Sequence, residues 1–300
     1  MRKSVNRTTV LLTLLLGLFV SGGAFAEKGQ GFSEKQAALP AGSAVGKSIK
    51  EDLVRREVQV GQRVERLIVN GAVDVVFRQG GSAEPLLQVS ALPDDWNNFK
   101  VDYSGGRLML SLVNHTDDLV KGPVQVELEL PVLHDVTLNG SGSFAAASPM
   151  EGKDVLLLVN GSGQIHCAWL AVEGLHARVN GSGQIALDYV EAESLHQDIS
   201  GSGRLQIADL QGSELTATLN GSGRMSLAGR AANAHLELNG SGRLDADALE
   251  AGNVEATVAG SGKISCWAAG RLDGTARGSG SIRYKGTPED CNISGNVRRK

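Results

Sequence analysis

The chain has 300 residues, a formal net charge of −4, 41% apolar residues and only 4% aromatic residues. So small a net charge gives no argument for a nucleic-acid partner, and so few aromatic rings leave few stacking surfaces for bases or sugars. The apolar content is sufficient for a hydrophobic core, so the 39 glycines do not indicate a disordered low-complexity chain.

The first 26 residues have the pattern of a secretory signal peptide. Three basic residues precede an apolar run at residues 10–20, and Ala24-Phe25-Ala26 forms a small-residue cleavage site before Glu27. The apolar run is shorter than the ~20 residues needed to span a bilayer, which favours cleavage near Ala26 over an uncleaved anchor. We therefore expect an exported protein, periplasmic or extracellular at the cell surface, with no transmembrane segment in the mature chain.

Two less regular segments follow. Residues 27–57 have few apolar side chains and mixed charge, and we interpret them as a flexible leader. Residues 58–137 are predicted to be a β-rich first coil with extra strands that cap the N-terminal end of the fold. Within them, Gly105-Gly106 indicates a tight hairpin, and residues 124–130 alternate apolar and polar side chains until Pro131.

A repeated Gly-Ser-Gly tripeptide organises the rest of the chain. It recurs every 18–21 residues, and its first glycine is Gly140, Gly161, Gly181, Gly201, Gly221, Gly240, Gly260 and Gly278. The residue before it is often asparagine, at Asn139, Asn160, Asn180, Asn220 and Asn239. A fixed period of this length indicates a solenoid. We expect the tripeptides to be structural corners whose glycines, Gly203 included, have positive φ. The segment at Asn70-Gly71 is a degenerate ninth copy.

Apolar and polar residues alternate on both sides of each corner, and the apolar ones keep the same offset in every copy. Alternation with period two predicts strands, and equal offsets predict apolar columns when the copies stack. We therefore predict an all-β fold, a right-handed parallel β-helix (β-solenoid) with ~20-residue coils. The regular coils cover residues 138–287 and a tail covers 288–300, and residues 58–290 form one continuous domain.

These features resemble a known family. Three stretches carry the likeness: Val64 to Gly80, Pro131-Val-Leu-His-Asp-Val-Thr-Leu-Asn-Gly-Ser-Gly142, and the Gly-Ser-Gly series ending in Gly278-Ser-Gly-Ser-Ile-Arg-Tyr-Lys-Gly-Thr-Pro288. They are similar to the head GIN domain family, described as "putative auto-transporter adhesins". The resemblance extends over residues 55–290 and implies an exported or envelope-bound β-helix. It implies no catalytic residues.

Several motifs are better explained by structure than by chemistry. The Asn-Gly-Ser glycosylation pattern falls on the corners, the glycine runs do not continue as nucleotide-binding loops, and the corners lack the Asp of calcium-binding β-helices. His176, His196 and His235 share an outward offset, but without a nearby carboxylate they indicate surface histidines rather than a metal site. We expect no metal and no cofactor.

Asp245 and Asp247 are the best candidates for a catalytic carboxylate pair, because they face the same side of one strand next to Arg243. The alternative to a binding module is therefore a polysaccharide-acting enzyme, a lyase or hydrolase, on the same β-helix scaffold. A close cluster of carboxylates in a groove of the folded protein would favour that enzyme.

The third position after each corner glycine points outward and holds four cations in succession: Arg204, Arg224, Arg243 and Lys263. In coils stacked about 4.8 Å apart these charges repel one another unless acids or a ligand compensate. Adjacent outward positions supply only Asp198, Glu237 and Asp245. One interpretation is a solvated surface. The sharper hypothesis is a track for an anionic polymer, such as an acidic polysaccharide or lipopolysaccharide.

The remaining predictions concern thiols and function. Export permits disulfides, but Cys167 and Cys266 stand five coils apart, so we expect both to be buried, unpaired thiols. For Cys291 in the tail, pairing with Cys266 stays open. We expect a non-catalytic, adhesin-like binding or structural module of the bacterial cell envelope. Its partner is an anionic glycan or an envelope protein, not a nucleic acid.

Overall fold

The computed structural model describes residues 53–60, 63–80, 85–113 and 122–300. All described residues belong to one compact unit, residues 47–300. The expected signal peptide and most of the expected leader lie outside the described residues. Across the described ranges, no helix is both long and apolar enough to cross a membrane.

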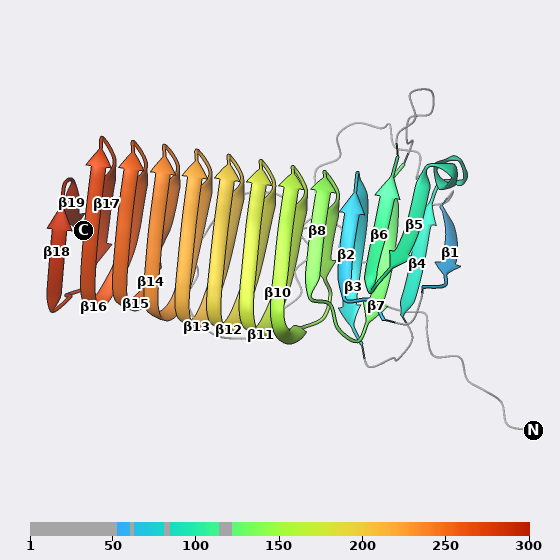
Figure 1. Ribbon diagram of the computed structural model, residues 1–300, viewed down its shortest axis with the longest axis horizontal. Coiled ribbons are helices and arrows are strands. Elements are labelled where there is room, and N and C mark those ends of the chain that lie inside the picture. Colours follow the sequence, from blue (N-terminus) through green and yellow to red (C-terminus); the bar gives the residue numbers. More distant parts are fainter. Residues whose placement is uncertain (1–52, 61–62, 81–84, 114–121) are drawn as a thin grey trace, which may run out of the picture. The chain divides into compact units, whose positions relative to one another are not determined.

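Parallel coils stacked side by side make up most of the described chain, which confirms the predicted parallel β-solenoid (Figure 1). In the regular part, one continuous strand leaves a Gly-Ser-Gly corner, turns at the opposite edge and returns to the next corner. These strands are β11 (Gln164–Gly181), β12 (Gln184–Gly201), β13 (Arg204–Gly221), β14 (Arg224–Gly240), β15 (Arg243–Gly260) and β16 (Lys263–Gly278), and β10 (Met150–Gly161) is the returning part of the coil before β11. Strands β2 (Arg66–Asn70) and β3 (Val73–Gln79), and then β8 (Asp135–Gly140) and β9 (Ser143–Ala146), form the two coils before them.

The register follows the repeat, because residues at equal offsets pair across adjacent coils. Ile185 of β12, for example, pairs with Ile165 of β11 and with Leu205 of β13. The apolar columns on both sides of the corner are buried, and they form one continuous core along the stack. Tyr284, in the last coil, is the one half-buried member of the column six residues after the corner glycine.

Each corner uses its two glycines for different reasons. The first glycine has positive φ at all eight Gly-Ser-Gly corners and at Gly71, with φ of 127° at Gly201. A Cβ on Gly201 would also lie 2.6 Å from the carbonyl oxygen of Gly181. Gly203 does not have positive φ, contrary to our expectation. Its constraint is steric, since a Cβ there would lie 2.5 Å from Cγ1 of Val179 and 2.8 Å from the oxygen of Gly183.

The asparagines before the corners form a hydrogen-bonded ladder. The side chain of Asn139 donates to Asn70, Asn160 to Asn139, Asn180 to Asn160, and Asn239 to Asn220, over 2.9–3.1 Å. The ladder is interrupted at Ser200, which occupies the register position between Asn180 and Asn220. Side-chain amides therefore connect successive coils along the outside of the corner edge.

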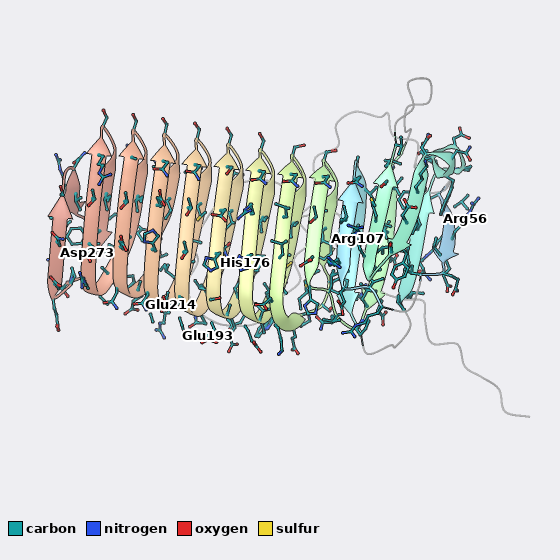
Figure 2. All side chains as sticks on the ribbon, in the orientation of Figure 1. Arg56, Arg107, His176, Glu193, Glu214 and Asp273 are labelled. Carbon is teal, nitrogen blue, oxygen red and sulfur yellow. The ribbon has the colours of Figure 1, made fainter. Side chains whose placement is uncertain are left out.

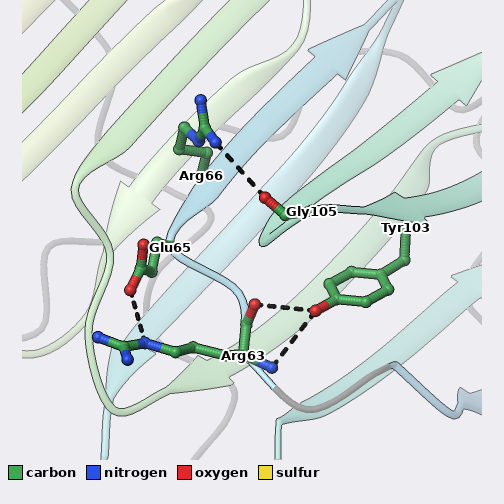
Figure 3. A network of polar contacts seen from close by, with 5 residues as sticks. All are labelled: Arg63, Glu65, Arg66, Tyr103 and Gly105. Atoms are coloured by element: carbon green, nitrogen blue, oxygen red, sulfur yellow. Dashed lines mark hydrogen bonds and ion pairs between the residues drawn. The ribbon is translucent and has the colours of Figure 1, made fainter.

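Further strands cover the N-terminal end of the solenoid. They are β1 (Val54–Val58), β4 (Leu86–Ala91), β5 (Phe99–Ser104), β6 (Arg107–Leu112) and β7 (Val124–Leu130), with the 3₁₀ helix η2 (Pro93–Asn97) between β4 and β5. Strands β6 and β7 continue the parallel stack beside β2 and β3, whereas β1, β4 and β5 are added antiparallel. The hairpin predicted at Gly105-Gly106 is confirmed, because β5 and β6 are antiparallel and both glycines have positive φ. Tyr103 ties the hairpin to the first coil by donating its hydroxyl to the carbonyl oxygen of Arg63 at 3.0 Å (Figure 3).

The C-terminal tail forms one more short coil. Strand β17 (Ser281–Lys285) pairs with β16, and β18 (Asp290–Ser294) and β19 (Val297–Arg299) pair with β16 and β17 in turn. Asp247 anchors this end, because its carboxylate lies 2.7 Å from Nζ of Lys300 and 3.4 Å from Nζ of Lys285. The hydrogen bond from Lys300 is the main cause of a lowered pKa at Asp247.

All three cysteines are unpaired, which confirms the prediction for Cys167 and Cys266. Both of these thiols are buried, and burial raises the pKa of each to about 12. They therefore stay neutral and serve as small apolar core residues. Cys291 is exposed in β18 and forms no disulfide with Cys266.

A cationic groove along the stacked corners

The four predicted cations form a continuous column on adjacent coils. Arg204 pairs in register with Arg224, Arg224 with Arg243, and Arg243 with Lys263. All four residues are exposed. Because neighbouring parallel strands lie about 4.8 Å apart, the column places four positive charges within roughly 14 Å along the stacking direction.

A groove of about 480 Å³ runs beside this column. Its lining combines the four cations with the serines of four consecutive corners and the second glycines of the first three, and the serines are Ser202, Ser222, Ser241 and Ser261. The groove therefore offers guanidinium and ammonium donors next to a row of exposed hydroxyls.

The four cations of this column form no close ion pair with the described residues. Over the described part of the chain, none of the four cations lies within 4.0 Å of a carboxylate, whereas five other arginines form ion pairs: Arg55, Arg63, Arg178, Arg230 and Arg271. Arg204 does contact the amide oxygen of Gln184, at 3.5 Å. Like charges held this close repel one another, which is unfavourable for folding. The described ranges of the protein leave most hydrogen-bond donors of these four side chains unused.

The acids that the sequence suggested as partners are engaged elsewhere or poorly placed. Asp198 pairs with Arg178 at 3.0 Å, and Glu237 accepts a hydrogen bond from Asn239 at 2.7 Å. Asp245 lies close enough to feel Arg243 and Arg224, but desolvation is the larger effect and raises the pKa of its carboxyl.

The other candidate residues do not come together as a reactive centre. The rings of His176 and His196 stack with centroids 4.7 Å apart, while His235 contacts Glu255 at 3.2 Å. Among the described residues, no group of three or more His, Cys, Asp or Glu side chains is arranged to hold a metal ion. Asp247 is committed to the lysines of the last coil, and no carboxylate lines the groove.

Two features of the structure do not follow from the sequence pattern as interpreted above. The pattern marks the corner serines only as part of the turn, yet they form one wall of the groove. Their signal is present all the same, because a serine occupies the middle of every Gly-Ser-Gly tripeptide. The second feature is an aromatic pair, Trp169 and Tyr189, whose ring centroids lie 4.3 Å apart, with Trp169 46% exposed.

Fold and groove together define a parallel β-solenoid with an open cationic groove on one edge. The chain belongs to the family described as "Putative auto-transporter adhesin, head GIN domain", whose model matches residues 64–223 and 178–288. The family resemblance noted in the sequence is thereby confirmed. No protein of curated function matches the chain.

Solved structures of distant relatives share the fold. A protein described as a putative adhesin from Parabacteroides distasonis is 19% identical with a TM-score of 0.63, and covers 83% of this chain and 97% of its own. A second P. distasonis protein, described as a putative lipid binding protein, is 23% identical with a TM-score of 0.61 and the same coverage. A putative adhesin from Parabacteroides merdae is 18% identical with a TM-score of 0.62, covering 83% and 96%.

Proposed function

We propose that this protein is an exported, non-catalytic binding module of the cell envelope, and that its groove holds an anionic polymer along the stacking direction. The observation that carries the proposal is the column of Arg204, Arg224, Arg243 and Lys263. Its charges lie in a groove, and no carboxylate of the described residues lies within 4.0 Å of them. Fixed cations that the fold does not neutralise are suited to an anionic ligand.

The chemistry of the groove favours carboxylate or phosphate groups on a hydroxyl-rich backbone. A guanidinium can donate two parallel hydrogen bonds to one carboxylate or phosphate, and three of the four cations are arginines. The row of serines can both donate and accept hydrogen bonds, as sugar hydroxyls require. An acidic polysaccharide or the acidic part of a lipopolysaccharide combines these two demands.

The family and the fold support binding more than catalysis. The family and two of the similar structures are described as adhesins, and a third structure as a lipid-binding protein. A polysaccharide lyase or hydrolase on this scaffold would need acid–base groups facing its substrate. The lining of the groove supplies cations and hydroxyls only. The signal-peptide pattern of residues 1–26 supports export.

The test is a variant in which all four cations are replaced, Arg204→Gln, Arg224→Gln, Arg243→Gln and Lys263→Gln. We expect the mature wild type to bind immobilised polygalacturonate and purified lipopolysaccharide at low salt, to lose binding as salt rises, and the variant to bind neither. The fold should survive, because removing mutually repelling exposed charges relieves strain. Urea unfolding of the variant should therefore occur at an equal or higher midpoint.

A matched control replaces two cations outside the groove, Arg178→Gln and Arg230→Gln. Because these side chains already pair with Asp198 and Glu250, the control variant should bind as the wild type does. The groove is not the binding site for these polymers if the wild type binds neither polymer at low salt, or if the quadruple variant binds them as well as the wild type does.

A further inference from the structure

The cationic column is one part of a longer column whose charge changes along the stack. Continuing in register toward the N-terminal end, Arg204 is followed by Gln184, Gln164, Ser143, Asp74 and then Gln125 of β7. The column is therefore positive over β13–β16, neutral but hydrogen-bonding over β9, β11 and β12, negative at β3 and neutral again at β7. A linear ligand lying along it would meet a different chemistry at each end.

The neutral part presents the same hydroxyl row as the cationic part. Ser162 and Ser182 are exposed at the corners next to Gln164 and Gln184, as Ser202 and Ser222 are next to Arg204 and Arg224. An amide side chain both donates and accepts hydrogen bonds but carries no charge. This part of the column can hold sugar hydroxyls, and it offers no compensation for an acidic group.

The acidic position at β3, Asp74, repels an anionic chain. Asp74 lies in register beside Ser143, whose hydroxyl donates to the Asp74 carboxylate at 2.6 Å. Ser143 is thus occupied by that bond, and an acidic group reaching this coil would meet a carboxylate of like charge. The column favours acidic groups only over the span from Arg204 to Lys263.

We propose that the groove binds its glycan in one orientation, with a block of acidic groups over Arg204, Arg224, Arg243 and Lys263 and neutral sugar units continuing over Gln184 and Gln164. This inference rests on the proposed function and narrows it. The ligand class is an oligosaccharide whose acidic groups are confined to one end, and a uniformly acidic polymer fits only over the cationic coils.

The first experiment measures affinity against ligand length by calorimetry, with oligogalacturonates of about two to ten units. We expect wild-type affinity to rise until the acidic chain covers the four cationic coils and then to level off. Only a small further increase should remain, because a longer chain can bind in several positions along the column. In the variant Gln164→Lys/Gln184→Lys, affinity should go on rising with length, because the cationic column is two coils longer.

The second experiment uses an acidic tetramer extended at either end with neutral galactose units. When the neutral units are attached at one of the two ends, wild-type affinity should rise several-fold. Gln164→Ala, which leaves the contact between Gln184 and Arg204 in place, should reduce that gain while leaving affinity for the plain tetramer unchanged. Replacement of Ser281, beyond the opposite end of the cationic column, by alanine is the matched control and should leave the gain intact.

The outcomes separate the two proposals. If no oligogalacturonate of any length binds, the proposed function itself is wrong. If oligogalacturonates bind but wild-type affinity rises with length as in the lysine variant, or neither neutral extension adds affinity, then the track is real and the orientation is wrong.

Discussion

At the scale of single residues, the corner depends on two glycines that are needed for different reasons. Gly201 has positive φ, and an added Cβ would also meet the carbonyl oxygen of Gly181, a backbone atom held by the stack. At Gly203 the closest contact would be with a side-chain atom, Cγ1 of Val179. Shortening a neighbouring side chain cannot relieve the strain of a backbone conformation, but it can relieve a contact with that side chain.

This difference predicts a selective rescue. Gly201→Ala and Gly203→Ala should each lower the free energy of unfolding by about 1–3 kcal/mol. Adding Val179→Ala should recover part of the loss in Gly203→Ala, with a favourable coupling of about 0.5–1 kcal/mol, and none of it in Gly201→Ala. Urea unfolding of the four variants and of Val179→Ala alone gives both couplings. Equal couplings would mean that the two glycines share one constraint.

At the scale of secondary-structure elements, coils are joined by side-chain ladders as well as by backbone hydrogen bonds. The asparagine ladder runs from Asn70 to Asn180 and resumes from Asn220 to Asn239. Ser200 is too short to bridge the position between them. Each amide-to-amide bond adds a directional contact that fixes the register of neighbouring coils.

Ser200→Asn should therefore complete the ladder between β11 and β13. With asparagine at 200, Asn180 and Asn220 gain a common neighbour, and we expect a net stabilisation of about 1 kcal/mol. The measurement is the urea unfolding midpoint, compared with Ser200→Ala, which cannot form the bonds and should leave the midpoint nearly unchanged. A midpoint for Ser200→Asn no higher than that of the wild type would show that the ladder adds no stability.

The coils themselves are largely predictable, because a repeat fixes register without knowledge of tertiary contacts. Equal offsets in the sequence become paired residues in the structure, as for Ile165, Ile185 and Leu205. The shorter coils are less predictable. The register of β13 and β14 shifts between Ile207 and Leu210, where β14 has one residue fewer than β13. Gly229 lies at this shift and has φ of 118°. The spacing between corner glycines shows that this coil is one residue shorter, but not where along the coil the register shifts.

The candidate site is predictable in position and not in its electrostatics. A shared offset from the corner glycine is enough to place Arg204, Arg224, Arg243 and Lys263 in one column. Whether they have counter-ions depends on side-chain directions, which an offset does not specify. Asp198 is a plausible partner by position, yet it turns to Arg178 on its own face of the coil.

At the scale of the solenoid as a whole, charge is separated between its edges. The strands end at the corner edge, where the cationic groove lies, while the labelled Glu193 and Glu214 lie at the opposite edge (Figure 2). A protein with a net charge of −4 can therefore still present a local positive surface. Such separation steers an anionic ligand toward the groove and away from the acidic edge.

Stacked coils also explain why the fold says little about the ligand. The corner glycines, the asparagines and the apolar columns serve the stack, so they are needed whatever is bound. Specificity is confined to outward offsets that the stack leaves free, and here one such offset holds four cations in sequence. The ligand therefore has to be identified from that offset and its surroundings.

The most direct test of this account maps which arginines an anionic ligand covers. Wild-type protein is treated briefly with phenylglyoxal, with and without bound oligogalacturonate, and the modified arginines are quantified by mass spectrometry. We expect the ligand to protect Arg204, Arg224 and Arg243, while Arg230 at a distant part of the same coil and Arg107 in the N-terminal cap react as before. Protection of Arg230 or Arg107 with none at Arg204, Arg224 and Arg243 would contradict the account.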